Sequence, residues 1–331
     1  EISDEEKEVV KELKSRKLIK SVERIKRILK ITELGEKIYE SGIEVKEEIT
    51  QITPEYIKDG KWRKYEIRAY DVKAVAPRIP CGKKHPLRRI IEEIRRIFIR
   101  MGFIEIKGNI IESSFWNFDA LFVPQDHPAR EMQDTFYLEH PAITELPKRE
   151  TVNAVKKAHE GKAYGSKGWD YRWDPNIARK ALLRTHTTAT TIRYLSEHRE
   201  LPVKVFSVDR VFRRETLDYK HLPEFHQCEG ILMDKGVGLS HLMGILKHFY
   251  KELGFPEIRF RPAYFPYTEP SIEVIVKTEG RGEWMELGGA GIFRPEVTEP
   301  LGVKYPVLAW GLGIERIAML RLNLDDIRKL Y

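Results

Sequence analysis

The stretch VFSVDRVFRRETLDYKHLPEFHQCEG, residues Val205–Gly230, decides how this chain folds. Its apolar and β-branched residues up to Phe212 predict one strand, and Phe225–Leu232 predicts a second. The polar residues between them, closed by Pro223, predict the tip of a hairpin. Six side chains near the strand ends can bind a ligand as well as pack: Arg213, Glu215, His221, Phe225, Gln227 and Glu229.

Together these six side chains suit a nucleotide. An arginine can fork onto a phosphate, and a glutamate can accept a hydrogen bond from an exocyclic amine. An exposed phenylalanine offers a flat face on which a base can stack. A salt-rich surface hairpin is the simpler explanation for any one of them, but six in one hairpin favour a nucleotide site.

The same residues point to a family. FRRE and FHQCEG resemble motif 2 of class II aminoacyl-tRNA synthetases, in the form found in phenylalanyl-tRNA synthetase α subunits of archaeal and eukaryotic type. GLGIERIAML (Gly311–Leu320) resembles motif 3, and HPLRRIIEEIRRIFIRMGF with the later Pro124 resembles motif 1. Four further segments match that family in order: HPAREMQDTFYL, LLRTHTTA, YFPYTEPS and ELGGAGIFRPEV. The resemblance covers about Gly82–Asn323.

The resemblance implies an α+β fold over residues 85–331, with the antiparallel β-sheet flanked by helices of the class II catalytic domain. Before it, Leu29 and Ile31 flank Lys30 at strand spacing and predict a basic β-ribbon. Residues 1–46 therefore resemble a partial winged-helix appendage, and a solvated charged face is the competing interpretation. Residues 47–84, punctuated by Pro and Gly, predict a partly structured linker.

Composition is compatible with this organisation. The chain has 331 residues and a net charge of +7, so a polyanionic partner is plausible without being required. Cys81 and Cys228 lie far apart and without metal-ligand spacing, which favours a reducing cytoplasm and no disulfide. No apolar run approaches the roughly 18 residues of a membrane span.

By resemblance, the activity is the formation of phenylalanyl-adenylate from L-phenylalanine and ATP, followed by transfer of the acyl group to tRNA(Phe). The family works as a heterotetramer of two α and two β subunits, so the resemblance also implies a β-type partner and a motif 1 helix at a subunit interface. An O-phosphoserine-tRNA ligase with the same architecture is one alternative. A catalytically inactive paralogue that binds RNA is the other.

The nucleotide end of the site takes its residues from the hairpin and from motif 3. The resemblance implies that Arg213 binds the α-phosphate and the reacting carboxylate, and that Glu215 and Phe225 bind adenine. Arg316 covers the opposite face of the adenine, and His221 helps to hold the pyrophosphate. Two carboxylates are offered to Mg²⁺, Glu269 and Glu286, of which Glu286 also belongs to the ATP site.

The amino-acid end takes its residues from several segments. A substrate ammonium can only donate hydrogen bonds and needs acceptors, which Gln227 and Glu229 supply. Hydroxyls and free N–H groups at the start of a predicted helix suit an anion, although simple N-capping explains them too. The resemblance favours substrate contact there by Thr188 and His186. It further implies phenylalanine contacts by these residues: Cys228, Phe265, Tyr267, Phe293, Ala309 and Gly311.

One segment stays unassigned by these arguments. Residues 148–180 are an unusually polar excursion, with a helix predicted at Thr151–His159 and a Gly-, Trp- and Tyr-rich loop after it. A loop of this length inside a compact domain is normally functional or an insertion. Its basic and aromatic residues suit RNA contact, and a passive insertion is the alternative.

Overall fold

The computed structural model divides the chain into two compact units, Glu1–Cys81 and Gly82–Tyr331. The structure describes residues 4–20, 22, 28–42, 47–69, 71, 73, 79–131, 134–277 and 284–331. Among the helices within these ranges, none is long and apolar enough to span a bilayer. The unit boundary lies close to the predicted linker end, and each unit is described by itself below.

The first unit contains short elements. They are α1 (Asp4–Ser15), α2 (Glu33–Glu40), β1 (Glu48–Ile49), α3 (Pro54–Lys58), the 3-10 helix η1 (Lys61–Lys64) and β2 (Glu66–Ile67), with β1 and β2 paired in parallel. The hydroxyl of Thr32 caps α2 by accepting from the Gly35 N–H. The predicted basic ribbon is wrong for its described part, because residues 28–32 form no strand and Leu29 is 96% exposed. The preceding basic residues, 21 and 23–27, lie outside the described residues.

The second unit is built on a sheet that has seven strands within the described residues, in the order β3-β6-β7-β11-β10-β9-β8. Their bounds are β3 Ile104–Glu105, β6 Val203–Phe212, β7 Glu224–Met233, β8 Ile258–Phe265, β9 Thr268–Lys277, β10 Trp284–Phe293 and β11 Val307–Gly313. All neighbouring strands pair antiparallel except β3, which runs parallel to β6. The predicted antiparallel sheet is therefore confirmed, with one short parallel strand at its edge.

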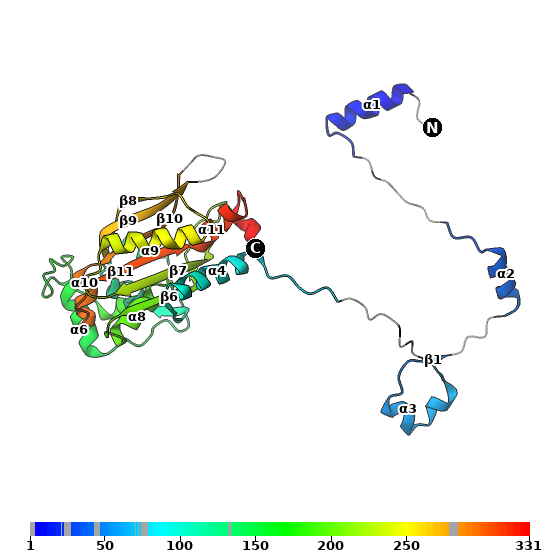
Figure 1. The fold of residues 1–331 in the computed structure, drawn as a ribbon, viewed down its shortest axis with the longest axis horizontal. Coiled ribbons are helices and arrows are strands. Elements are labelled where there is room, and N and C mark those ends of the chain that lie inside the picture. The colour runs from blue at the N-terminus through cyan, green and yellow to red at the C-terminus, as the bar shows by residue number, and fades with distance from the viewer. Residues whose placement is uncertain are drawn as a thin grey trace. The chain divides into compact units, whose positions relative to one another are not determined.

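One face of the sheet is covered by α4 (Pro86–Arg100), α9 (Leu239–Glu252) and α11 (Ile314–Arg321) (Figure 1). Helix α4 forms because apolar residues recur at helical spacing, and it buries Ile90, Ile94 and Phe98 among others. It ends before Gly102, which has the left-handed φ of +83° that favours glycine. Aromatic rings dominate this core, where Phe98 stacks between the rings of Phe249 and Trp310.

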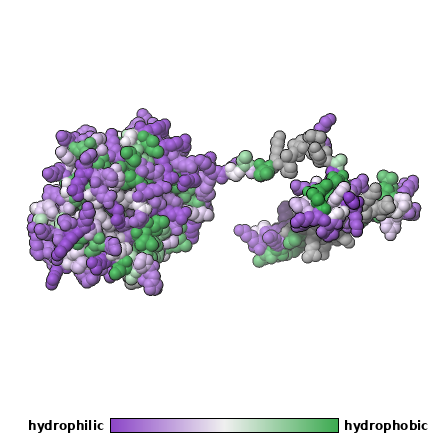
Figure 2. All heavy atoms as spheres, turned by 90° about the horizontal axis from the view of Figure 1, so that it is seen from below, coloured by the Kyte–Doolittle hydropathy of each residue, from purple (hydrophilic) through white to green (hydrophobic). Residues whose placement is uncertain are grey.

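The other end of the unit is built around a second apolar core. Its elements are a small sheet of β4 (Ile111–Ser113) and β5 (Ala181–Leu183), with α5 (Ser114–Asn117), η2 (Asp119–Leu121), η3 (Pro128–Arg130), α6 (Arg149–His159), α7 (Pro175–Arg179), α8 (Thr188–Glu197), α10 (Pro295–Thr298) and η4 (Glu299–Leu301). A last 3-10 helix, η5 (Ile327–Leu330), follows α11. The visible surface of the unit is mainly hydrophilic with scattered apolar residues (Figure 2), as expected when the large apolar side chains are buried.

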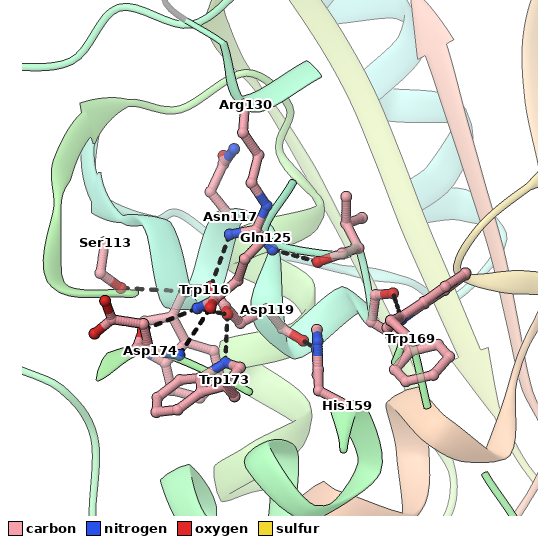
Figure 3. A network of polar contacts seen from close by, with 12 residues as sticks. Ser113, Trp116, Asn117, Asp119, Gln125, Arg130, His159, Trp169, Trp173 and Asp174 are labelled. Carbon is pink, nitrogen blue, oxygen red and sulfur yellow. Dashed lines mark hydrogen bonds and ion pairs between the residues drawn. The ribbon is translucent and has the colours of Figure 1, made fainter. Parts of the chain in front are cut away.

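The polar excursion is folded against this second core. Its helix, α6, begins at Arg149 and ends at His159, which confirms the predicted helix. Trp173 in the following loop is 3% exposed, and its indole N–H donates to the Asp119 carboxylate at 2.6 Å (Figure 3). Trp169 donates to the Phe122 carbonyl at 3.1 Å. Both indoles are therefore engaged inside the protein and do not stand out as free rings.

Candidate active site

The hairpin of β6 and β7 supplies the centre of the site. Its ladder runs from Val203 opposite Met233 to Phe212 opposite Glu224, so the predicted strand–tip–strand arrangement is confirmed. Side chains alternate across a strand. Phe225, Gln227 and Glu229 consequently share the face that borders a cavity.

The same alternation corrects the prediction for Cys228. Its side chain points to the opposite face of β7, where it is fully buried in the core beneath α4 and α9. Burial raises the pKa of its thiol well above the ordinary value. The Cys228 side chain therefore does not face the cavity and packs as a small apolar core residue.

The cavity has a volume of about 390 Å³ and lies over the middle strands of the sheet. It is lined by most of the predicted site residues, contributed by the hairpin, α8, the β8–β9 turn, β10, β11 and α11. They are Thr188, Arg213, Glu215, His221, Phe225, Gln227, Glu229, Phe265, Tyr267, Glu286, Phe293, Ala309, Gly311 and Arg316. The predicted residues His186, Cys228 and Glu269 do not line it.

Cations and a ring gather at the hairpin end of the cavity. The Arg213 Nε donates to the Thr185 carbonyl at 3.1 Å, and its guanidinium carbon lies 5.3 Å from the centre of the Phe225 ring. Arg213 Nη1 is 3.9 Å from a Glu215 carboxylate oxygen. Within the described residues Arg316 makes no hydrogen bond or ion pair. Two guanidinium groups therefore face the cavity with donors to spare for an anionic ligand.

Acceptors gather at the other end, around Glu229. This carboxylate is 5% exposed, and burial raises its pKa to about 7 although the Thr188 hydroxyl donates a hydrogen bond to it. The side-chain oxygen of Gln227 is also buried and has no partner within the described residues. A buried acceptor without a donor is costly. This end of the cavity is therefore suited to a cationic donor such as an ammonium group.

An aromatic wall borders the acceptors. The rings of Phe265 and Tyr267 lie 6.0 Å apart at 17°, and Phe293 meets Tyr267 edge-on at 6.5 Å. Burial raises the pKa of the Tyr267 hydroxyl to about 12, so it stays protonated. A Cβ atom on Gly289 would lie 2.5 Å from the Phe265 ring, so only glycine leaves this ring its present place. The wall suits an apolar or aromatic side chain.

His186 does not line the cavity, and the direct substrate contact expected of it stays a prediction. It is half-buried beside the start of α8, where its Nε2 lies 2.9 Å from the Asn117 carbonyl. The carbonyl can only accept, so Nε2 carries the proton and Nδ1 is left as an acceptor without a partner within the described residues. Burial, with the Arg213 charge nearby, lowers the pKa of His186 to about 3. It is a neutral imidazole beneath the site.

The two carboxylates offered to magnesium are not brought together. Glu286 lines the cavity and lies opposite Ile275 in the ladder between β10 and β9. Glu269 lies at the other end of β9, next to Thr268, which is opposite Phe293. Six residues of strand separate these positions, about 20 Å. The side chain of Glu269 is 79% exposed, and its nearest cation is Arg294 at 3.9 Å. The two groups therefore cannot share one ion, and Glu269 is excluded from the cavity.

Glu315 is a site residue that sequence reasoning missed. It is 1% exposed and accepts the His226 N–H at 2.8 and 2.9 Å, the His226 Nδ1 at 2.8 Å and the Tyr331 hydroxyl at 2.7 Å. The ladder between β7 and β11 ends at the pair Gln227 and Gly313, so the Glu315 carboxylate takes over as the acceptor for the next N–H. A buried acid next to Arg316 in GLGIER is the signal that could have revealed it.

Lys220 is a second residue that sequence reasoning missed, and it lines the cavity from the hairpin tip. The tip is held at Tyr219, whose carbonyl accepts the Ile327 N–H from η5 at 3.0 Å. The sequence gives no indication of a functional role for a single lysine in a polar hairpin tip, because lysines are mostly exposed on protein surfaces.

The comparisons with known proteins agree with this geometry. A family model described as tRNA synthetases class II core domain (F) matches residues 69–331. The phenylalanine–tRNA ligase alpha subunit of Methanothermobacter thermautotrophicus is 56% identical over 333 residues, covering 100% of this chain and 65% of the relative. That of Methanopyrus kandleri is 58% identical over 315 residues, covering 93% of this chain and 60% of the relative.

The chain thus spans 60–65% of the length of these two relatives. Among solved structures, pyrrolysyl-tRNA synthetase from Desulfitobacterium hafniense is similar, with a TM-score of 0.53 and 16% identity. That likeness covers 74% of this chain and 72% of the other, and at this identity it supports the fold alone.

Proposed function

The chain belongs to the family of tRNA synthetase class II core domains (F), and from that membership we propose that it activates L-phenylalanine with ATP and transfers it to the terminal adenosine of tRNA(Phe). One observation carries the choice of substrate. A single cavity has arginines at one end and a buried carboxylate beside an aromatic wall at the other. A nucleoside triphosphate needs the arginines, and an amino acid with an aromatic side chain needs the carboxylate and the aromatic wall.

In the first step the phenylalanine carboxylate attacks the α-phosphate of ATP and pyrophosphate leaves. The substrate itself is the nucleophile, so the protein contributes position and charge stabilisation. Arg213 would contact the α-phosphate and the carboxylate, where negative charge accumulates. Arg316 would cover the adenine and reach the γ-phosphate, and His221 would hold the pyrophosphate.

The adenine would stack on Phe225, while Glu215 accepts a hydrogen bond from its amine. Arg213 already lies over the same ring, so Phe225 also orients the guanidinium. One aromatic side chain would in this way align the base and the cation that acts on the α-phosphate.

Phenylalanine would bind at the other end of the cavity. Glu229, Gln227 and Thr188 would receive its ammonium, and the wall of Phe265, Tyr267 and Phe293 would enclose its ring. Ala309 and Gly311 would form the floor. An added Cβ at Gly311 would meet the Gln227 amide nitrogen and a Glu229 carboxylate oxygen at 3.1 Å each, so a larger residue there would displace both side chains.

Magnesium fits this site through Glu286. Mg²⁺ is usually held by one or two carboxylates together with substrate phosphates and waters. Among the residues that the structure describes, no group of three or more His, Cys, Asp or Glu is placed to hold a metal, which suits an ion shared with the substrate. When bound, it would neutralise charge on the ATP phosphates.

Two macromolecular partners follow from the proposal. The relatives are alpha subunits, so we propose a second, β-type subunit, in an assembly of two of each, with α4 at a subunit interface. The acceptor end of tRNA(Phe) would approach the same cavity for the transfer step. An O-phosphoserine ligase is disfavoured, because a phosphorylated side chain would need cations where the wall has Phe265, Tyr267 and Ala309.

The test is amino-acid-dependent exchange of pyrophosphate into ATP, measured with every amino acid and with the partner subunit present. Exchange should depend on phenylalanine and reach only a low level with tyrosine. Exchange that depends on another amino acid would contradict the substrate assignment. No exchange with any amino acid, together with intact RNA binding, would support the inactive paralogue.

A further inference from the structure

The turn between β8 and β9, which carries Phe265 and Tyr267 of the aromatic wall, is held from outside the cavity by Arg294. The backbone N–H of Arg294 donates to the Tyr267 carbonyl at 3.1 Å, and the side-chain Nη1 donates to the Pro266 carbonyl at 3.5 Å. Its guanidinium also forks onto Glu296 at 2.9 and 3.3 Å. Arg294 does not line the cavity, so it can influence a ligand only through the turn.

The Arg294 guanidinium also lies over the ring of Phe122, 5.4 Å from its centre. Phe122 has a φ of +59°, which is uncommon for a bulky residue and requires support from its surroundings. Two hydrogen bonds supply it. The Phe122 N–H donates to the Asp119 carbonyl at 2.9 Å, and its carbonyl accepts from the Trp169 indole at 3.1 Å.

Asp119 anchors this segment through a buried polar network (Figure 3). Its carboxylate is inaccessible to solvent and accepts hydrogen bonds from three side chains, and its carbonyl lies 2.8 Å from the His159 Nε2. The three donors are Arg130 at 3.0 Å, Gln125 at 2.9 Å and Trp173 at 2.6 Å. A carboxylate that is hydrogen-bonded to three side chains restrains the segment that carries it. Phe122 therefore offers Arg294 a restrained surface.

We propose that Arg294 is a positioning residue for amino-acid selection: it connects the restrained Phe122 segment to the β8–β9 turn and so fixes the spacing of the aromatic wall. This proposal rests on the proposed function. It assigns a role to the excursion of residues 148–180, since Trp169 and Trp173 belong to that excursion and stabilise the segment beneath Arg294.

The physical consequence concerns discrimination between phenylalanine and tyrosine. A hydrophobic pocket rejects an added hydroxyl only about a hundredfold, and it does so through fit. Fit requires that Phe265 and Tyr267 do not move apart when the larger substrate enters. If Arg294 is removed, the turn loses a charged donor at its Pro266 carbonyl and its contact with Phe122. Tyrosine then enters at a lower cost.

The experiment compares variants in the full-length subunit assembled with its partner, by pyrophosphate exchange with phenylalanine and tyrosine. Arg294→Met should raise the phenylalanine KM about tenfold, as expected for loss of a hydrogen bond from a charged group, and should reduce discrimination against tyrosine by a similar factor. The ATP KM should stay unchanged. Arg294→Lys keeps a cation over Phe122 but loses the fork, so its effect should be intermediate.

Trp169→Phe tests the connection from further away. It removes the indole donor to the Phe122 carbonyl and shortens the ring that packs 5.0 Å from the Phe122 ring, so it should lower tyrosine rejection in the same direction by a smaller factor. The matched control is Arg193→Met. Arg193 also contacts a carboxylate, Glu112 at 2.6 Å, and lies 5.0 Å over a ring, Trp116, but it does not line the cavity or touch the turn. This control should lose stability and keep wild-type selectivity.

Each outcome decides something. Lowered selectivity in both Arg294 variants and Trp169→Phe, with Arg193→Met unchanged, supports the proposal. Wild-type selectivity in Arg294→Lys and Trp169→Phe overturns it, even if Arg294→Met does not fold. Equal loss of selectivity in Arg193→Met also overturns it, because general destabilisation would then explain the effect. Absence of phenylalanine-dependent exchange in the wild type would instead contradict the proposed function.

Discussion

Replacing Glu229 with glutamine should raise the free energy of unfolding and weaken the binding of phenylalanine. The Glu229 carboxyl is 5% exposed, and burial raises its pKa from the ordinary 4.5 to about 7. Each pKa unit is worth about 1.4 kcal/mol, so ionisation of Glu229 costs the empty protein about 3 kcal/mol at pH 8. Glutamine stays neutral and can still accept from Thr188. We therefore expect Glu229→Gln to raise the free energy of unfolding at pH 8 by up to about 3 kcal/mol.

The effect of Glu229 on stability should depend on pH. The folded state holds the Glu229 proton more tightly than the unfolded state, so stability falls as pH rises from about 4.5 to about 7. At pH 5 the gain from Glu229→Gln should therefore shrink to less than about 1 kcal/mol. Denaturant unfolding at pH 5 and pH 8 without phenylalanine measures both values. Glu286→Gln, an exposed change in the same cavity, should stay within about 0.5 kcal/mol at each pH.

The functional cost of the same variant follows from the ammonium. Loss of a buried charge partner costs about 2 kcal/mol or more, or roughly 30-fold in affinity. The phenylalanine KM of Glu229→Gln should rise by that factor, and the ATP KM should not. Two results would refute this reasoning: a variant less stable than wild type at pH 8, or equal increases in both KM values.

Four further predictions concern other parts of the cavity. Arg213→Ala should slow phenylalanine-dependent exchange by roughly 10²–10³, and Arg213→Lys should not restore it, because lysine lacks the forked donors of a guanidinium. Near-normal exchange would contradict the role of Arg213 at the α-phosphate. Glu315→Gln places an amide N–H against converging donors, so its ATP KM should rise while its phenylalanine KM holds, and equal increases would argue against it. Gly289→Ala pushes the Phe265 ring inward and should weaken phenylalanine binding by about 1–3 kcal/mol in a titration, with no loss arguing that the ring moves freely. Ala309→Gly enlarges the floor and should raise the ratio of tyrosine to phenylalanine exchange above the roughly 1:100 expected of the intact pocket, and an unchanged ratio would exclude this floor.

Local chemistry was sufficient to predict much of the fold. The hairpin followed from alternating apolar residues and the Pro223 punctuation, and α4 followed from isoleucines at helical spacing before Gly102. The predicted ribbon at Leu29 and Ile31 failed because strand spacing alone does not supply a pairing partner. Only tertiary hydrogen bonds decide whether two alternating residues become a strand.

For the site as well, some placements could be predicted from the sequence and others required the fold. Exclusion of Cys228 was within reach of the sequence, because residues next to each other on a strand face opposite sides and Glu229 had already been assigned to the cavity. The position of His186 was not, since only the fold brings the Asn117 carbonyl to its Nε2. Glu269 likewise required the strand register, which puts it about 20 Å along β9 from the level of Glu286.

The end of the cavity around Glu229 holds acceptors whose capacity the protein does not fill. The Gln227 oxygen has no partner within the described residues, and burial raises the pKa of Glu229. Each such group costs the folded state free energy. A substrate ammonium brings three donors and a positive charge, and it can reach the Gln227 and Glu229 acceptors directly. Under the proposed function, the free energy that the empty site costs would be recovered when an amino group binds, and the wall of Phe265 and Tyr267 would select the side chain.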